Sequence, residues 1–165
     1  MRLLAALADR LLCLALAVGA AQFPLYYAQY LTVVAGAQAE ASRRYEALRS
    51  AAEALGLEVE TFVRRHEQNG DAVFQASGAL HRDTLSRHAA LSAALAELRE
   101  APAWAQPLRL ARHYDADLAA AVEFQPGLPL SVAGAAWAGL GLLLAMLISA
   151  TLGWLWRRPP LPVRA

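Results

Sequence analysis

Two apolar stretches lie near the ends of the chain, separated by a long segment in which polar and apolar residues alternate with helical spacing. The first stretch covers residues 11–34 and the second covers residues 130–156. A helix rises 1.5 Å per residue, so about 20 apolar residues cross the hydrocarbon core of a bilayer. The pattern therefore predicts two transmembrane helices that flank an extramembrane segment, residues 35–129.

The first part of the extramembrane segment has the spacing of an amphipathic helix and of a coiled coil. Its apolar residues recur at alternating steps of four and three positions: Ala41, Tyr45, Leu48, Ala52 and Leu55. Gly56 is a residue type that commonly ends a helix. The apolar spacing nevertheless continues beyond Gly56 to Val59 and Phe62, so a break there and a continuous helix both fit the sequence.

Turn and capping residues divide the rest of the segment. Asn69-Gly70 predicts a turn, and Asp71 suits the N-cap of a long helix that ends near Glu100. A last helix is expected from about Ala103 to Glu123. The apolar residues expected to face inward on these two helices are Leu80, Leu85, Leu91, Leu95, Leu98, Trp104, Leu108, Ala111, Leu118 and Val122. No strand-like alternation of useful length occurs, so the predicted class is all-α, with a helical hairpin or bundle between the two spans.

The chain must return to the second span through the short connector 125–129, which limits where the last helix can end. We therefore expect the helix at residues 103–123 to lie close to the membrane plane, or to bend at Pro107. Trp104 and Phe124 near its two ends would suit a membrane interface.

Positive charges next to the spans predict the orientation. Arg10 precedes the first span, Arg157 and Arg158 follow the second, and positive flanks of short tails stay in the cytoplasm. Tails 1–10 and 157–165 are then cytoplasmic, and the loop is periplasmic in a Gram-negative inner membrane. The alternative for the N-terminus is a signal peptide cleaved after the small residues Val18-Gly19-Ala20. Apolar character and tyrosines beyond this point favour an uncleaved span.

Three polar or helix-bending residues interrupt the first span: Gln22, Pro24 and Gln29. Polar side chains cost free energy in hydrocarbon, so they usually face protein or water. Proline removes one helical hydrogen bond and bends the helix. One interpretation is a polar notch that binds a ligand or partner. The other is a kinked helix whose glutamines bond to the second span or reach the interface.

Small residues at intervals of four lie along one face of the second span, and a matching pair lies in the first span. Small side chains let helix backbones approach closely in a membrane. The pattern fits packing between the two spans, or a homodimer interface. The helix-packing candidates are Ala15, Gly19, Gly141, Ala145, Ser149 and Gly153.

The loop contains no recognisable catalytic, cofactor or metal motif. His81 and His88 are seven residues apart on one helix, about 10 Å, which is too far to share a metal directly. Asp115 and Asp117 point to different helix faces and make no convincing acid/base pair. With ten arginines against thirteen acidic residues, the loop has a net charge of −3, which argues against nucleic-acid binding. The single cysteine, Cys13, permits no internal disulfide.

Several short motifs resemble the bacterial membrane-protein family "domain of unknown function 2937". They are Gln22-x-Pro24, Gln29-Tyr30, Glu40-Ala41 and Asp71-x-Val73-Phe74, followed by a closing apolar span. The resemblance covers nearly the full length and implies two uncleaved spans around a helical loop. It implies no activity and no catalytic residues, because the family has none assigned.

The sequence therefore predicts a non-enzymatic inner-membrane protein that contacts the lipid bilayer. We expect a structural or accessory role in which the periplasmic helices bind an envelope protein or a second copy of the chain. The alternative is a small transport or lipid-handling component that uses the notch at Gln22, Pro24 and Gln29.

Overall fold

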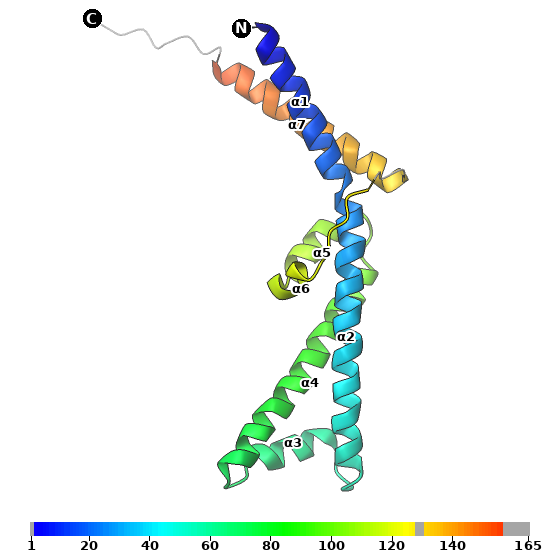
Figure 1. Ribbon diagram of the computed structural model, residues 1–165, viewed down its shortest axis with the longest axis vertical. Coiled ribbons are helices and arrows are strands. Elements are labelled where there is room, and N and C mark those ends of the chain that lie inside the picture. The colour runs from blue at the N-terminus through cyan, green and yellow to red at the C-terminus, as the bar shows by residue number, and fades with distance from the viewer. Residues whose placement is uncertain (1, 128–130, 157–165) are drawn as a thin grey trace, which may run out of the picture. The chain divides into compact units, whose positions relative to one another are not determined.

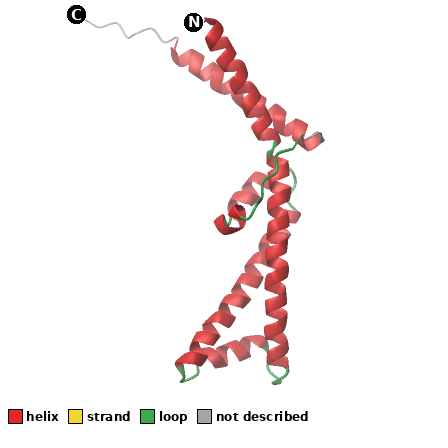
Figure 2. Cartoon of the chain, viewed as in Figure 1, coloured by secondary structure: helices red, strands yellow, loops and turns green. Residues whose placement is uncertain are grey.

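A computed structural model describes residues 2–127 and 131–156 of the chain. Over these residues the chain forms helices and no strand, which confirms the predicted all-α class (Figures 1 and 2). The helices are α1 (Arg2–Ala21), α2 (Phe23–Glu53), α3 (Val59–Glu67), α4 (Ala72–Arg99), α5 (Gln106–Arg112), α6 (Ala116–Ala120) and α7 (Val132–Trp156).

The chain divides into two compact units. The span unit comprises Met1–Ala28 and Phe124–Ala165, and the loop unit comprises Gln29–Glu123. Two helical stretches, Asp9–Glu53 and Val132–Thr151, are long and apolar enough to cross a membrane. Both predicted spans therefore correspond to such helices, although residues 128–130 and 157–165 lie outside the described part of the chain.

In the span unit, α1 packs along α7. The two helices approach most closely at Gly141, where an added Cβ would overlap the carbonyl of Leu16 and come within 2.8 Å of the Ala20 Cβ. Gly139 has no such neighbour within 4 Å. A glycine is thus required at one position of this interface and not at the position two residues before it.

The first apolar stretch is interrupted at Gln22, between α1 and α2. Pro24 has no N–H to donate to the carbonyl of Ala20, so the α-helical ladder cannot run through this point. The N–H of Gln22 instead donates to Gly19 over 3.1 Å, a tighter turn. The predicted interruption of the first span at Pro24 is therefore present as a junction between two helices.

A glycine ends α2 inside the loop unit. Gly56 has φ +67°, a backbone conformation that side-chain-bearing residues rarely adopt. The N–H of Leu57 donates to the Ala52 carbonyl over 3.0 Å, and that of Gly56 to the Glu53 carbonyl over 2.9 Å. These two bonds form a Schellman cap. The chain therefore breaks at Gly56, one of the two possibilities left by the sequence.

The predicted turn and cap before the long helix are also present. The Asp71 carboxylate accepts a hydrogen bond from the N–H of Val73 over 2.8 Å and caps α4. The turn lets α3 fold back against α4, with Gly78 at the contact. A Cβ there would lie 2.6 Å from the backbone nitrogen of Glu67, so the two helices touch through their backbones.

The core of the loop unit follows the predicted stripes only in part. Its buried apolar residues are Tyr30, Val34, Ala41, Leu48, Ala52, Val63, Leu91, Leu95, Leu98 and Ala105. On α4 and at the end of α2, two residues expected in the core are exposed: Leu55 is 66 % and Leu80 is 67 % exposed. Leu55 follows the end of α2, and Leu80 lies on the part of α4 that diverges from α2 (Figure 1).

The single helix predicted for residues 103–123 is wrong, because the chain forms α5 and α6 with a break at His113–Asp115. The Asp115 carboxylate accepts from the N–H groups of Asp117 and Leu118, so it starts a new helix instead of continuing the first. The predicted inward face is wrong as well: Trp104 is 83 % and Leu108 is 72 % exposed. Ala111 is also exposed, whereas Leu118 and Val122 are half-buried.

Candidate functional site

The break between α5 and α6 is held by a tyrosine on α2. Tyr30 is fully buried, and its hydroxyl donates to the carbonyl of His113 over 2.9 Å. The same oxygen accepts from the N–H of Asp115 over 3.0 Å. One hydroxyl thus satisfies a donor and an acceptor that the interrupted helix would otherwise leave without helical partners. The ring of Tyr114 stacks parallel to that of Tyr30, at 6.4 Å between centroids.

Charged side chains tie α5 to α4 beside this tyrosine. The Glu97 carboxylate accepts a hydrogen bond from Arg109, lies 3.0 Å from the Nε2 of His113 and 3.8 Å from the Nη1 of Arg112. His113 holds the pKa of Glu97 below its usual range, and the two arginines add to the effect. One carboxylate thereby contacts three basic side chains, and these contacts hold the end of α5 against α4.

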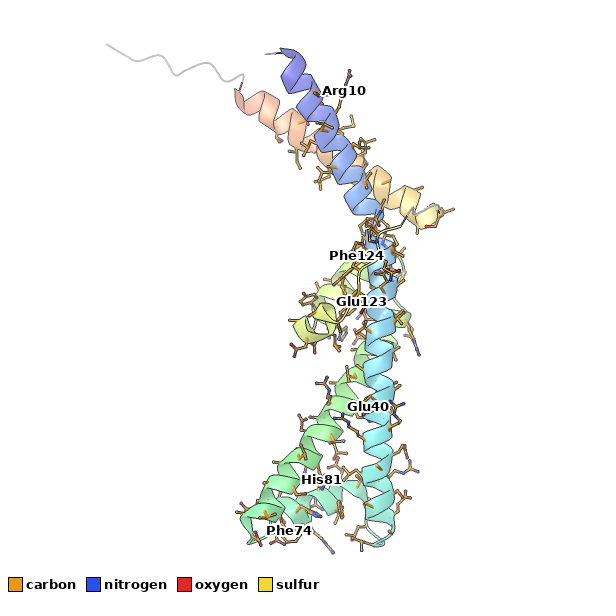
Figure 3. The ribbon with its side chains drawn as sticks, in the orientation of Figure 1. Arg10, Glu40, Phe74, His81, Glu123 and Phe124 are labelled. Carbon is orange, nitrogen blue, oxygen red and sulfur yellow. The ribbon has the colours of Figure 1, made fainter. Side chains whose placement is uncertain are left out.

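A second polar cluster joins α3 to α4 at the other end of the loop unit. The rings of His66 and His81 lie 5.4 Å apart, edge to face, between Phe62 and Phe74. The Nδ1 of His66 lies 2.9 Å from the Phe62 carbonyl, so it carries the proton and donates. Figure 3 labels His81 and Phe74 of this cluster. The pairing could not be read from the sequence, because the two histidines lie 15 residues apart on different helices.

The histidine cluster acts as a packing contact between α3 and α4. Burial lowers the pKa of His81, and neighbouring His66 lowers it further, so the neutral ring is favoured. Beside it, Arg82 pairs with Glu60 at 2.8 Å and with Glu67 at 2.9 Å. In the described residues, no three side chains of metal-binding type come together. The cluster therefore provides two histidines, fewer than the three or four protein ligands of a zinc site.

An open cleft separates α2 from α4 above α3. It has a volume of about 440 Å³ and lies wholly within the loop unit. Its walls are mostly apolar, with a few polar side chains, and consist of Arg44, Ala47, Leu48, Ala51, Phe62, Leu80, His81 and Thr84. The ribbon shows α2 and α4 moving apart toward α3 (Figure 1).

The length of α3 accounts for the cleft. Its nine residues make a rod about 13 Å long, whereas packed helices lie about 8–10 Å apart. Where α2 and α4 are still close, the ring of Tyr45 stacks on that of His88, at 4.4 Å between centroids.

The predicted notch residues do not form an open site. Within the span unit, the side-chain amide of Gln22 donates to the Gly127 carbonyl over 3.0 Å and accepts from the Gly127 N–H over 3.3 Å. Gln22 is therefore occupied by the chain's own backbone, ahead of the second span. Pro24 lies in the first turn of α2, and Gln29 is a half-buried residue of the loop unit.

The small-residue candidates are only partly in contact. Gly141 and fully buried Ala145 lie at the α1–α7 interface, and Ser149 donates a hydrogen bond to the carboxylate of Asp9. The partners predicted in the first span are wrong, since Leu16 and Ala20 take that place. Ala15 and Gly19 are exposed, and Gly19 has no neighbour within 4 Å. Gly153 belongs to α7, at a position whose surroundings lie outside the described part of the structure.

Aromatic residues collect around the connector in the span unit. Phe23 lies 4.6 Å from Trp137, and Tyr26 lies 5.9 Å from Phe124, measured between ring centroids. Such a collar at the end of an apolar helix pair is typical of a membrane interface.

Residues 4–159 match the family described as "Protein of unknown function (DUF2937)". The chain belongs to this family. The match confirms the resemblance seen in the sequence, and it covers both apolar helices and the loop unit. No curated protein and no solved structure matches the chain significantly.

The Tyr30 hydroxyl yields a first prediction. Tyr30→Phe leaves the His113 carbonyl and the Asp115 N–H without their buried partner, which costs about 1–3 kcal/mol in the free energy of unfolding. Thermal or denaturant unfolding in mild detergent, followed by circular dichroism, measures the loss. Tyr114→Phe is the control, because that side chain is 57 % exposed and water solvates its hydroxyl. Equal stability of Tyr30→Phe and the parent chain would contradict this role.

The lowered pKa of His81 gives a pH dependence. Because the folded state binds a proton at His81 less readily than the unfolded state, stability is complete above the unfolded pKa and falls as pH drops below it. We expect destabilisation as the pH falls below about 6.5, the ordinary pKa of histidine, and a weaker pH dependence in His81→Gln. Glu97→Gln is the contrast, because the lowered pKa of Glu97 acts only at more acidic pH, below about 4.5. The idea fails if His81→Gln has the pH profile of the parent.

Proposed function

We propose that this chain is a non-catalytic accessory protein of the bacterial inner membrane, and that its loop unit binds another envelope protein on the periplasmic side. The observation that carries the proposal is the open cleft between α2 and α4. Its apolar lining includes exposed Leu80 and half-buried Phe62 beside buried Leu48. An apolar surface of this kind, rimmed by polar groups, is typical of a protein-binding site.

The composition of the cleft suits a helix as the bound element. Two diverging helices with apolar inner faces form a groove that accepts an amphipathic helix, whose apolar residues replace water along Phe62 and Leu80. Arg44 at the rim is available to an acidic residue of the partner, although it also pairs with Glu40 at 3.0 Å. His81 in the lining has the Ser77 hydroxyl 3.2 Å from its Nε2, but the two residues lie one turn apart on α4, and Ser77 is not among the residues that line the cleft.

The experiment is site-specific photocrosslinking in living cells. A photoreactive amino acid at Leu80, which lines the cleft, should give a discrete crosslinked protein. The same amino acid at Leu55 is the matched control, because Leu55 is equally exposed but lies outside the cleft lining: 66 % against 67 %. A crosslink from both positions, from neither, or only to a second copy of the chain would contradict partner binding through the cleft.

The location is tested separately by reporter fusions. Arg10 and the tail arginines support a cytoplasmic location of both termini, so a reporter after Ala165 should be active there. A reporter inserted at Gly70, in the turn between α3 and α4, should be active only outside the cytoplasm. The reverse pattern would overturn the orientation. A mature chain that begins at Ala21 would show a cleaved signal peptide instead of a span.

A further inference from the structure

Three large apolar side chains of the loop unit are exposed on the segment that runs from Trp104 to Tyr114. Trp104 is 83 %, Leu108 is 72 % and Tyr114 is 57 % exposed. Trp104 lies in the turn just before α5, and Leu108 lies in the first turn of α5. Tryptophan and tyrosine combine an apolar ring with a polar group, the composition that membrane interfaces favour.

The points where the loop unit is joined to the span unit indicate which surface these exposed side chains contact. The loop unit begins at Gln29 and ends at Glu123, and both residues are bonded directly to residues of the span unit. Tyr30, one residue after the first crossing, binds the backbone of His113 and Asp115. The end of the loop unit that contains α5 and α6 is therefore the end at which the chain enters and leaves the apolar helices. Figure 3 labels Glu123 and Phe124, the residues at the second crossing.

The distances within the loop unit keep Trp104 at this end. Helix α5 has seven residues, a rise of about 10 Å, and His113 follows it directly at the Tyr30 hydroxyl. The interaction of Arg109 with Glu97 holds α5 against α4. By contrast, α4 runs 28 residues, about 42 Å, so its first turn with exposed Val73 belongs to the opposite end of the unit.

We infer that the segment 104–114 is a membrane-interface anchor, in which Trp104 and Leu108 insert into the headgroup region of the bilayer. This inference rests on the membrane location proposed above, and it is independent of the partner in the cleft. The occupant is a lipid surface because the segment is exposed where both chain connections enter the membrane. Burial of its apolar side chains there removes them from water, and the tryptophan N–H can still bond to headgroups or water.

Tryptophan fluorescence in vesicles tests the anchor. The full chain is reconstituted into vesicles of phosphatidylethanolamine and phosphatidylglycerol, with and without a lipid brominated near the headgroup end of its acyl chains. In one variant Trp137, Trp154 and Trp156 are replaced by phenylalanine, so that only Trp104 remains. Bromine quenches from either leaflet, so the orientation of the chain in the vesicle does not affect the result.

Two matched variants provide the controls. A chain that keeps only Trp137 reports on the apolar helices, and a chain whose sole tryptophan is introduced by Val73→Trp reports on an equally exposed position at the far end of the loop unit. The anchor predicts a loss of emission at Trp104 comparable to that at Trp137, with a blue-shifted maximum, and no loss at position 73. Trp104→Ala with Leu108→Ala should leave the Trp137 quenching unchanged.

Each other result has a distinct meaning. Quenching of Trp137 without quenching of Trp104 overturns the anchor and leaves the membrane location intact. No quenching of Trp137 overturns the membrane location itself. Equal quenching at positions 104 and 73 overturns the anchor, because the whole loop unit then lies on lipid. A Trp104 emission that depends on protein concentration but not on bromolipid overturns it in favour of self-association.

Discussion

The loop unit depends on one buried hydroxyl. Tyr30 is the second residue of the loop unit and lies within α2. Its hydroxyl nevertheless bonds to the chain 83 and 85 residues later, at His113 and Asp115. Bringing together two parts of the chain this far apart costs the conformational entropy of closing a long loop. The hydroxyl, together with the carboxylate of Glu97, supplies bonds between the beginning and the end of that loop. The helices between these points are then free to extend away from the closure.

Local signals in the sequence predict where several helices begin and end. They do not predict contacts between residues that are far apart in the chain. Gly56 and Asp71 act through bonds to residues within five positions, so their residue types alone indicate a C-cap and an N-cap. The pairing of His66 with His81 depends on the turn at Asn69-Gly70 and on the close contact at Gly78. The spacing of residues along a single helix cannot predict such a pairing. The same limit applies to Tyr30 and His113. The broken helix at Asp115 was missed although its signal was present, since aspartate before a short apolar run is a capping residue.

The errors in the predicted core have one cause. The apolar stripes assume that a helix is covered along its whole length, but in the loop unit the neighbours of a helix change along its axis. Leu91, Leu95 and Leu98 are buried because α2 and α5 are near, whereas Leu80 on the same helix is 67 % exposed. In the span unit, the residues of α1 that face Gly141 are Leu16 and Ala20. The glycine lets the backbone of α1 approach closely there.

The cleft results more from the way α2 and α4 are connected along the chain than from the side chains that line it. A direct turn between α2 and α4 would let the two helices pack along their whole length at about 8–10 Å. The chain instead inserts α3, a helix about 13 Å long with buried Val63, between the far ends of α2 and α4. Leu80 and Phe62 are consequently left beside solvent in an otherwise regular amphipathic pattern. Gly78 lets α3 pack closely against α4, so the separation of α2 and α4 at this end follows from the way α3 is inserted between them.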